Sequence, residues 1–511
     1  MAPPTDEPLL ALDEIQGNVI PGFLKDHQHF LFFSIADASA AKKCLSNLNS
    51  RLSTASEVCT AHAHFKSMRE RLGHDPDAAH FVFKNIALSA TGLRKVTSKD
   101  EVDQFGDDAF KIGLTERSTL IGDPKVKTEP GHVSRWLVGG NTHPVDLVLI
   151  LASDDLQWLQ DESKKLVLEF SACGMKMVYE DKGDANAAPK HGHEQFGFKD
   201  NISRPAVRGR CPKDPFEYVS PRLLPADKAF DKIRPDFARP ADRLVWPGHF
   251  IFGYGRQKRD EPRTYNPADK AQGPKWADNG SFMVYRRLRQ NPDEFWRFVT
   301  ETSESLTKKY PAATVDKERF AALLIGRWRS GTPLVRGPST DIGINKDGPL
   351  NFFSYVEKMP TLPGDTWPNS PDADGSLCPF AAHIRKVNPR DQSTDLGLPE
   401  RTVPRSILRR GITYSSPPDD KGLIFVAYQS SIVDQFEFLM TNWMNQINRP
   451  QADAGQDPIL SQVHSRVFYL KIADKVEEIK IPRAFIVPTG GEYFFSPSIG
   501  FFKNTLAGLH I

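Results

Sequence analysis

Four stretches of the chain share one pattern, in which a β-forming apolar run leads directly into residues with the periodicity of a helix. In the third stretch Phe295, Phe298 and Val299 recur at i, i+3 and i+4, the spacing of one face of a helix. Two such units fall in each half of the 511-residue chain, which predicts two α+β domains, each an antiparallel sheet with flanking helices. The four stretches begin at His29, Val145, Ser281 and Gly422.

Residues 204–248 lie between the two halves and are rich in proline and arginine. Proline at that density interrupts helices and central strands, so this segment is predicted to connect two domains. We therefore expect a first domain over residues 1–205, a connector over 206–245 and a second domain over 246–511. A cofactor would then lie between the sheets or against one of them.

The composition argues against two kinds of partner. Lys and Arg number 66 against 64 Asp and Glu, a formal net charge of +2, so nothing favours nucleic acid or an anionic membrane surface. The longest apolar runs, such as residues 147–152, have the length of a strand and are too short to span a bilayer.

Five scattered cysteines bear on the compartment. They form no Cys-x-x-Cys pair, which predicts free or buried thiols in a reducing environment. The first residues carry no basic segment of the kind that opens a secretory signal. We therefore expect a cytoplasmic protein, with secretion after removal of a leader as the alternative. The five are Cys44, Cys59, Cys173, Cys211 and Cys378.

One histidine lies among three cations in "CPFAAHIRKVNPR", residues 378–390. His383 is followed by Arg385, Lys386 and Arg390. A protonated imidazole would be repelled there, so the pattern favours a metal on the ring nitrogen or a polyanion for the cations to bind. A haem would supply both, as an iron and two propionates.

Two further stretches are weak signals when each is taken alone. In "GFKDN", residues 197–201, the Asp200-Asn201 pair is typical of a turn without chemistry. In "RSILRRGITYSS", residues 405–416, Arg409 and Arg410 follow an apolar pair and precede a glycine, which predicts a strand that ends in a tight turn. By itself this stretch favours a solvated pair of arginines.

Together these three stretches resemble the dye-decolourising peroxidase family. The family has a Gly-x-x-Asp-Gly motif on the distal side of its haem, which "GFKDN" matches except at Asn201. It has a proximal haem histidine in a stretch similar to "HIRKVNPR", and a distal arginine two residues before a glycine, as in "ILRRGITY". Further similar pieces, such as "IQGNV", "WPGHFIFGYG" and "VPTGGEYFFSPSI", follow in the family's order over nearly the whole chain.

The resemblance implies a haem b peroxidase that uses hydrogen peroxide to oxidise aromatic and dye-like compounds by one-electron steps. It implies two ferredoxin-like modules of the dimeric α+β barrel type, with the haem held mainly by the second. It leaves both a monomer and a homodimer open. Two other readings stay open as well: a chlorite-decomposing haem enzyme of the same superfamily, and a non-enzymatic haem carrier or haem-iron release protein.

The resemblance also assigns roles to individual residues. His383 is expected to be the axial ligand of the haem iron. Asp200 is expected to act as general base and then acid, and Arg409 to stabilise negative charge on the peroxide and contact the haem. Arg390 is expected to contact a propionate. The backbone expected along the haem is that of Asn201, Ile202 and Ser203.

The second ring nitrogen of His383 should have a hydrogen-bond acceptor, because such a partner increases the electron donation of the ring. Asp434 and Glu437, in the fourth β–α unit, are the candidates, and the sequence does not rank them. His-x-His pairs at 62–64 and 191–193 have a spacing that suits a metal site on a strand, but no acid or cysteine array accompanies them, so surface histidines are the favoured interpretation.

Three positions depart from the family pattern. Asn201 replaces a glycine, although Asn tolerates positive φ better than other side chains. Thr413 and Ser415 stand where members often have Pro and Gly. His249 stands where relatives often carry an acid, and the sequence gives no chemical reason for it.

Overall fold

The structure is a computed structural model that describes residues 7–73, 81–222, 234–238, 241–313, 315–362, 364–367, 369–416, 418–463, 465–482 and 484–508. Parts of the predicted connector, residues 223–233 and 239–240, therefore lie outside the described residues. No helix within the described ranges is long and apolar enough to cross a membrane.

The N-terminal half contributes four antiparallel strands in the order β2-β4-β1-β5. In chain order this places the first and third strands in the centre, which is the ferredoxin-like arrangement implied by the family resemblance. α1 (Ala38–Asn47) and α7 (Leu156–Ala172) follow those two central strands. The strands are β1 (His27–Ile35), β2 (Phe83–Ser89), β4 (Leu147–Ser153) and β5 (Met175–Asp184).

The C-terminal half repeats this arrangement. β14 (Asp420–Gln429) and β11 (Ser281–Gln290) are central, β17 (Ile486–Ser496) lies beyond β11, and β12 (Leu408–Arg409) and β13 (Ile412–Ser416) both pair with β14. β17 also pairs with β2, which joins both halves in one ten-stranded sheet. The predicted pair of ferredoxin-like modules with antiparallel strands is confirmed.

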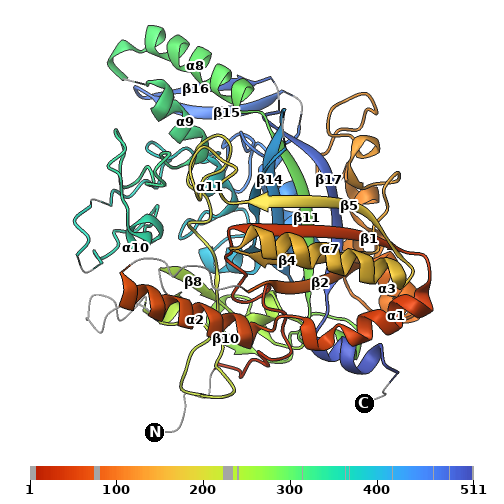
Figure 1. The fold of residues 1–511 in the computed structure, drawn as a ribbon. Helices are drawn as coiled ribbons and strands as arrows, with labels where there is room; N and C mark the ends of the chain where they lie inside the picture. The colour runs from red at the N-terminus through yellow and green to blue at the C-terminus, as the bar shows by residue number, and fades with distance from the viewer. Residues whose placement is uncertain are drawn as a thin grey trace.

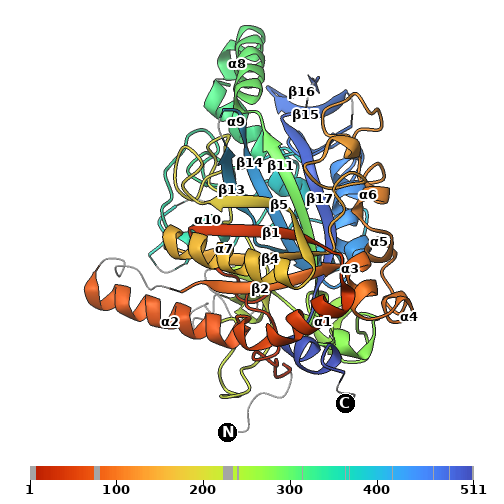
Figure 2. The same cartoon turned by 45° about the vertical axis from the view of Figure 1, so that its right-hand side comes forward.

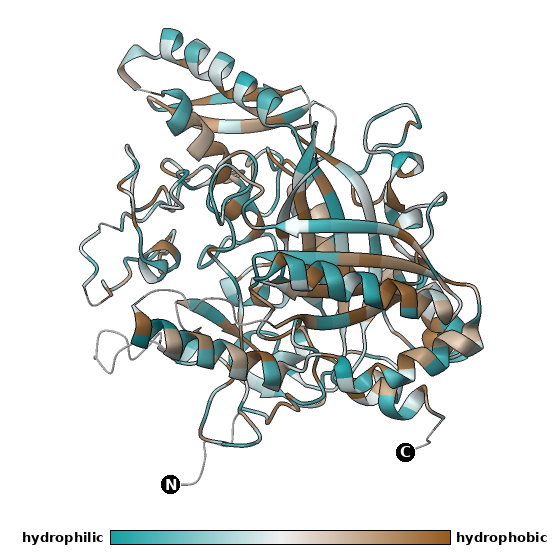
Figure 3. Cartoon of the chain, in the orientation of Figure 1, coloured by the Kyte–Doolittle hydropathy of each residue, from teal (hydrophilic) through white to brown (hydrophobic). Residues whose placement is uncertain are grey.

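The two sets of strands cross, with β1, β4 and β5 running across β11, β14 and β17 (Figures 1 and 2). Alternate residues of β1 point to opposite faces. Phe32 packs in a buried cluster with Tyr285 of β11, whereas Phe33 packs in a second cluster with Phe170 of α7. Each central strand is therefore covered on both faces, and α7 exposes a hydrophilic stripe outward (Figure 3).

The helix predicted after the fourth apolar run is present, but it is a π-helix. It comprises η9 (Ile432–Glu437) and η10 (Leu439–Met444). Ile432, Phe436 and Leu439 are buried, so the predicted apolar face is correct although the turns are wider than those of an α-helix.

The remaining elements surround these strands. In the first half they are α2 (Ala55–Leu72), α3 (Ala90–Val96), α4 (Lys99–Asp103), α5 (Asp108–Ile112), α6 (Leu114–Arg117) and β3 (Val138–Gly139). The connector holds β6 (Ala206–Val207), β7 (Phe237–Ala238) and β8 (Asp242–Val245), and the start of the second half holds η5 (Pro247–His249), β9 (Arg256–Lys258) and β10 (Glu261–Asn266). The second half adds α8 (Pro292–Lys309), α9 (Lys317–Ile325), α10 (Asp347–Asn351), α11 (His383–Val387), η8 (Pro399–Arg405), β15 (Arg466–Ile472) and β16 (Lys475–Ile481).

Candidate active site

His383 begins the short helix α11, and its ring is fixed by a buried aspartate. Nδ1 of His383 lies 2.8 Å from Oδ2 of Asp457, whose side chain is fully buried. The other carboxylate oxygen of Asp457 accepts hydrogen bonds from the backbone N–H groups of Ile459 and Leu460, at 2.8 Å each. Burial alone would raise the pKa of Asp457, but His383 and these N–H groups hold it below its usual value. The carboxylate of Asp457 is ionised, so Nδ1 of His383 carries the proton that it donates. Nε2 of His383 is then left free to bind a metal ion.

Both acceptors expected for His383 are wrong. Asp434 lies on η9 with an exposed side chain, and its carboxylate pairs with Arg405 at 3.1 Å. Glu437 is buried, but it accepts a bidentate ion pair from Arg117 at 2.6 and 2.5 Å. Asp457 instead comes from the irregular segment between η10 and β15. No periodicity or spacing in the sequence marks this aspartate.

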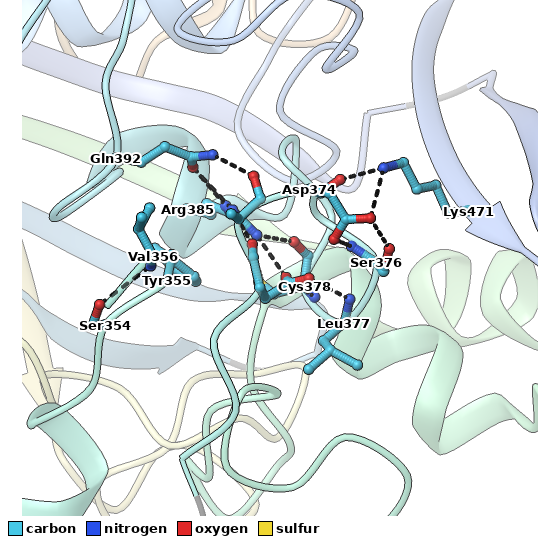
Figure 4. A network of polar contacts seen from close by, with 12 residues as sticks. Ser354, Tyr355, Val356, Asp374, Ser376, Leu377, Cys378, Arg385, Gln392 and Lys471 are labelled. Atoms are coloured by element: carbon cyan, nitrogen blue, oxygen red, sulfur yellow. Dashed lines mark hydrogen bonds and ion pairs between the residues drawn. The ribbon is translucent and has the colours of Figure 1, made fainter. Parts of the chain in front are cut away.

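Two of the cations beside His383 stabilise the fold. Arg385 is fully buried, pairs with Asp372 at 2.7 Å and donates to Gln392 (Figure 4). Lys386 donates to the backbone carbonyl of Gln446 at 2.8 Å, and also to those of Arg449 and Gly455. These contacts hold α11 against the segment that carries Asp457. The expectation that these cations gather around a ligand is therefore wrong for Arg385 and Lys386.

Asp200 lies in a loop that is organised by a half-buried glutamate. Glu194 accepts hydrogen bonds from the backbone N–H groups of Phe196 and Phe198 at 2.9 Å, and from the side chain of Gln290 at 2.5 Å. Burial raises the pKa of Glu194 to about 7 despite these donors. Asn201 adopts a φ of 60°, the left-handed conformation expected of the glycine that it replaces.

Asp200 and Arg409 meet across 209 positions of the sequence. Nη1 of Arg409 lies 3.2 Å from Oδ1 of Asp200, and Nη2 donates to the backbone carbonyl of Ser203 at 3.0 Å. Both side chains remain about one third exposed, at 34% each. The structure thus brings the two predicted catalytic residues together, with Ser203 beside them.

The neighbouring Arg410 has a different environment. It is tied to the first half of the chain through the carbonyls of Asn18 and Val19, at 3.0 and 2.9 Å. Burial, together with the nearby charges of Arg204 and Arg409, lowers its pKa to about 9. Of the two arginines singled out in the sequence, only Arg409 contacts Asp200.

Arg390 and Arg327 form a second concentration of positive charge. Arg390 donates to the carbonyls of Asn351 and Phe353 and stacks over the Phe353 ring, 3.7 Å from its centre. Burial and the charges of Arg390 and Arg409 lower the pKa of Arg327 to about 9. Within the described part of the chain neither Arg327 nor Arg390 forms an ion pair with a carboxylate. Such a group of guanidinium ions suits an anionic ligand.

The remaining predicted contact, Ile202, packs over a glycine. A Cβ at Gly331 would lie 2.6 Å from Cδ1 of Ile202, and Gly331 has a φ of +95°. Phe196 and Phe198 of the Asp200 loop share a buried cluster with Ala381 and Ala382, which precede His383. The loop that carries Asp200 and the segment that carries His383 therefore belong to one packed unit.

The histidine pairs and cysteines form no site. His62 and His64 lie on the helix α2 and not on a strand, and Nε2 of His62 is bonded to the carbonyl of Phe23. His191 pairs with Asp26 at 3.1 Å. Among the residues that the structure describes, no group of three or more His, Cys, Asp or Glu side chains could hold a metal ion. All five cysteines are free thiols.

Comparison with known proteins places these features in one family. The model of the DyP dimeric alpha+beta barrel domain matches residues 14–186, and that of the Dyp-type peroxidase C-terminal domain matches 250–469. The chain is 30% identical to a dye-decolorizing peroxidase of Exidia glandulosa, over 98% of this chain and 87% of that protein. It is 29% identical to one of Mycena epipterygia, over 96% and 86%.

Solved structures agree with these matches. A structure of an ancestral D-type dye decolorizing peroxidase superposes with a TM-score of 0.75 at 29% identity, covering 98% of this chain and 99% of that one. A mutant of the dye-decolorizing peroxidase from Pleurotus ostreatus superposes with a TM-score of 0.77 at 26% identity, covering 98% and 100%.

Proposed function

Because the chain belongs to the dye-decolorizing peroxidase family, we propose that Asp200, Arg409 and His383 carry the reaction of that family in this protein. The protein is a haem-dependent peroxidase that uses hydrogen peroxide to oxidise dyes and aromatic compounds. We further propose that the haem is haem b and that the oxidation proceeds by one-electron steps.

The chemistry of the donor set fits haem b. His383 has a free Nε2 to offer an iron, because its Nδ1 is committed to Asp457. Arg390 and Arg327 lack carboxylate partners within the described residues, so the propionates of a haem would supply the missing negative charge. No Cys-x-x-Cys-His stretch offers a covalent attachment, which favours the non-covalent haem b. When bound, haem supplies the redox-active iron at which peroxide is reduced.

His383 and Asp457 form the proximal side in this proposal. The ionised carboxylate of Asp457 orients the ring and strengthens imidazole as an electron donor. Asn201, Ile202 and Ser203 are proposed to lie along the haem with their backbone, because they directly follow Asp200.

Asp200 and Arg409 divide the work on the distal side. With haem bound, Asp200 would take a proton from one oxygen of hydrogen peroxide and return it to the other, which would leave as water, and the haem would supply the two electrons for cleavage of the O–O bond. Arg409 cannot exchange a proton at any working pH, so its guanidinium stabilises the negative charge on the peroxide and keeps Asp200 oriented.

We also propose a division into domains at residues 1–205, 206–245 and 246–511, which the two matched family segments support. A cytoplasmic location is proposed on the ground of five free thiols.

The observation that carries the proposal is the 3.2 Å contact between Arg409 and Asp200, two residues selected from separate motifs. Absorption spectra of the purified protein and of His383→Ala, with and without peroxide, test it. The wild type should show a haem spectrum that changes rapidly with peroxide, and His383→Ala should lose most of its haem. A variant that keeps normal haem content and spectrum would remove His383 from the site.

A further inference from the structure

A cavity lies apart from the residues of the candidate active site. Its volume is about 420 Å³, and it is bounded by η5 and β9, by the end of η8, and by η9. Asp200, His383 and Arg409 are not among the residues that line it. Ligand pockets in proteins commonly have volumes of about 300–1,000 Å³, so this cavity is large enough for a single aromatic ring with substituents.

The walls of this cavity carry an excess of positive charge. Asp269 and Asp434 are the acids that line it, and they lie 3.7 and 3.1 Å from Arg256 and Arg405. Arg259 makes no hydrogen bond or ion pair with any of the described residues. The arginines that line the cavity are Arg256, Arg259, Arg401 and Arg405.

The net positive charge of the cavity remains when an acid just outside the lining is included. Arg401 pairs with Asp260 at 2.5 Å, and Asp260 does not line the cavity. Four guanidinium groups then face three carboxylates, which leaves one positive charge at the wall. A guanidinium presents its donors in a fork that matches a carboxylate and also stacks on aromatic rings.

Three polar atoms of lining residues are buried without a hydrogen-bond partner in the described part of the chain. They are Nε2 of His249, Oε1 of Gln257 and Nε of Arg405. The side chains of His249 and Gln257 are nearly inaccessible, at 5% and 4% exposure. Buried polar groups are normally hydrogen-bonded, so three such atoms around one cavity indicate a polar occupant.

His249 preserves the positive charge of the cavity. Burial, with added repulsion from Arg256 and Arg405, lowers its pKa to about 3, so the imidazole is neutral. A carboxylate at this position, which the family resemblance suggests, would cancel the excess of one charge. The neutral ring instead adds a hydrogen-bonding group without altering the charge.

We propose that this cavity binds a small aromatic carboxylate that bears a ring hydroxyl, at a site separate from the haem pocket. The arginines receive the carboxylate, Leu396 and Pro404 contact the ring, and Gln257 offers an acceptor for the hydroxyl. The proposal concerns binding alone, so it stands independently of the catalytic assignments.

The cavity is connected to the distal arginine through the backbone. Gln435, which lines the cavity, donates to the carbonyls of His249 and Ser406 at 2.9 and 2.5 Å. Ser406 follows η8 and lies three residues before Arg409 on β12. A ligand held by Arg405 would therefore lie beside the segment that leads to Arg409, but not against Arg409 itself.

Equilibrium dialysis of 4-hydroxybenzoate against the holoprotein, with the iron blocked by cyanide, tests the site. One saturable site is expected, with no shift of the haem absorption on binding. Phenol, which lacks the carboxylate, should bind at least about tenfold more weakly, as expected for loss of a charged hydrogen bond. Arg259→Gln and Arg405→Gln should each weaken the binding of 4-hydroxybenzoate by about the same factor.

Arg297→Gln is the matched control. Arg297 is an exposed arginine of α8 that is paired with Glu294 and Glu301, far from the lining in sequence. Its replacement should leave binding unchanged. Arg259 is exposed and unpaired among the described residues, so its variant keeps the test decisive if Arg405→Gln fails to fold. Absence of saturable binding, binding that shifts the haem absorption, or equal affinity in Arg259→Gln would overturn the proposal.

Discussion

The ring of His383 donates from Nδ1 to a carboxylate of Asp457 that lies 74 residues further along the chain, at 2.8 Å. Asp457 is fully buried, and its second oxygen is held by two backbone N–H groups. The acceptor is therefore a fixed, ionised group, and the orientation of His383 is set by the fold before any ligand binds.

Asp457→Asn should weaken the haem site. The amide is about the size of the carboxylate but lacks its charge, so the imidazole becomes a poorer electron donor. We expect the haem reduction potential to rise and haem affinity to fall by about 10–100-fold, as is typical of such partners of metal ligands. Spectroelectrochemical titration and haem retention measure these effects. Asp434→Asn is the control, since Asp434 is an exposed carboxylate bound to Arg405, and it should behave as wild type.

The sequence predicted the sheet better than the contacts of the site. Each β–α unit carries an apolar run of strand length followed by a helical period, and such local patterns predict an antiparallel sheet with flanking helices. The order of the strands followed only from the family resemblance. The junction between the halves lies at β17, which pairs with β2 through Phe494 and Phe495 and with β3 through Gly490 and Gly491. Nothing local in the sequence specifies this pairing.

Closeness in the sequence to His383 does not predict which groups the cations after it contact. A helix turns by about 100° per residue, so Arg385 on α11 points to another side than His383, whereas Lys386, three residues on, stays near the face of His383. Arg385 instead meets Asp372, and Lys386 meets three backbone carbonyls. The contact of Asp200 with Arg409 was available only from the family resemblance, because no periodicity links positions 209 residues apart.

Arg410→Met should affect stability and not the reaction with peroxide. The substitution removes the donors to the buried residues Asn18 and Val19 from a half-buried position. Leaving buried acceptors unsatisfied costs about 1–3 kcal/mol, so the free energy of unfolding should fall by that order. Denaturant titration measures this loss, and the rate with peroxide should stay within about twofold. A rate as low as that of an Arg409 variant would show that Arg410 also acts in the site.

Glu194→Gln should change how stability depends on pH. The pKa of Glu194 is raised to about 7 by burial, from an ordinary value of 4.5, so the folded protein favours the protonated form. The stability from this group is fully present below pH 4.5 and is lost as pH rises through 7. The variant cannot ionise, so its stability relative to wild type should improve between pH 5 and pH 8. Thermal unfolding midpoints of the variant and the wild type at pH 5 and pH 8 measure this change. A difference between the two proteins that is the same at both pH values would contradict the raised pKa of Glu194.

Asp200→Asn and Arg409→Leu should separate proton transfer from charge stabilisation. Asn cannot accept a proton, so Asp200→Asn should keep haem but slow the spectral change with peroxide by about 10²–10⁴-fold. Aspartate is a usable base even in mildly acidic solution, where a histidine would already be protonated. Wild-type activity should therefore be highest at acid pH, with an acid limb of the kind that a carboxylate base gives.

The two variants should differ in that acid limb. Asp200→Asn should flatten it because the carboxylate base is gone, whereas Arg409→Leu should slow the reaction and leave the acid limb in place, since an arginine cannot act as the base. Stopped-flow rates across pH for both variants decide between them. An unslowed Asp200→Asn beside a strongly slowed Arg409→Leu would reverse the roles, and the 3.2 Å contact would then mean that Asp200 only positions Arg409.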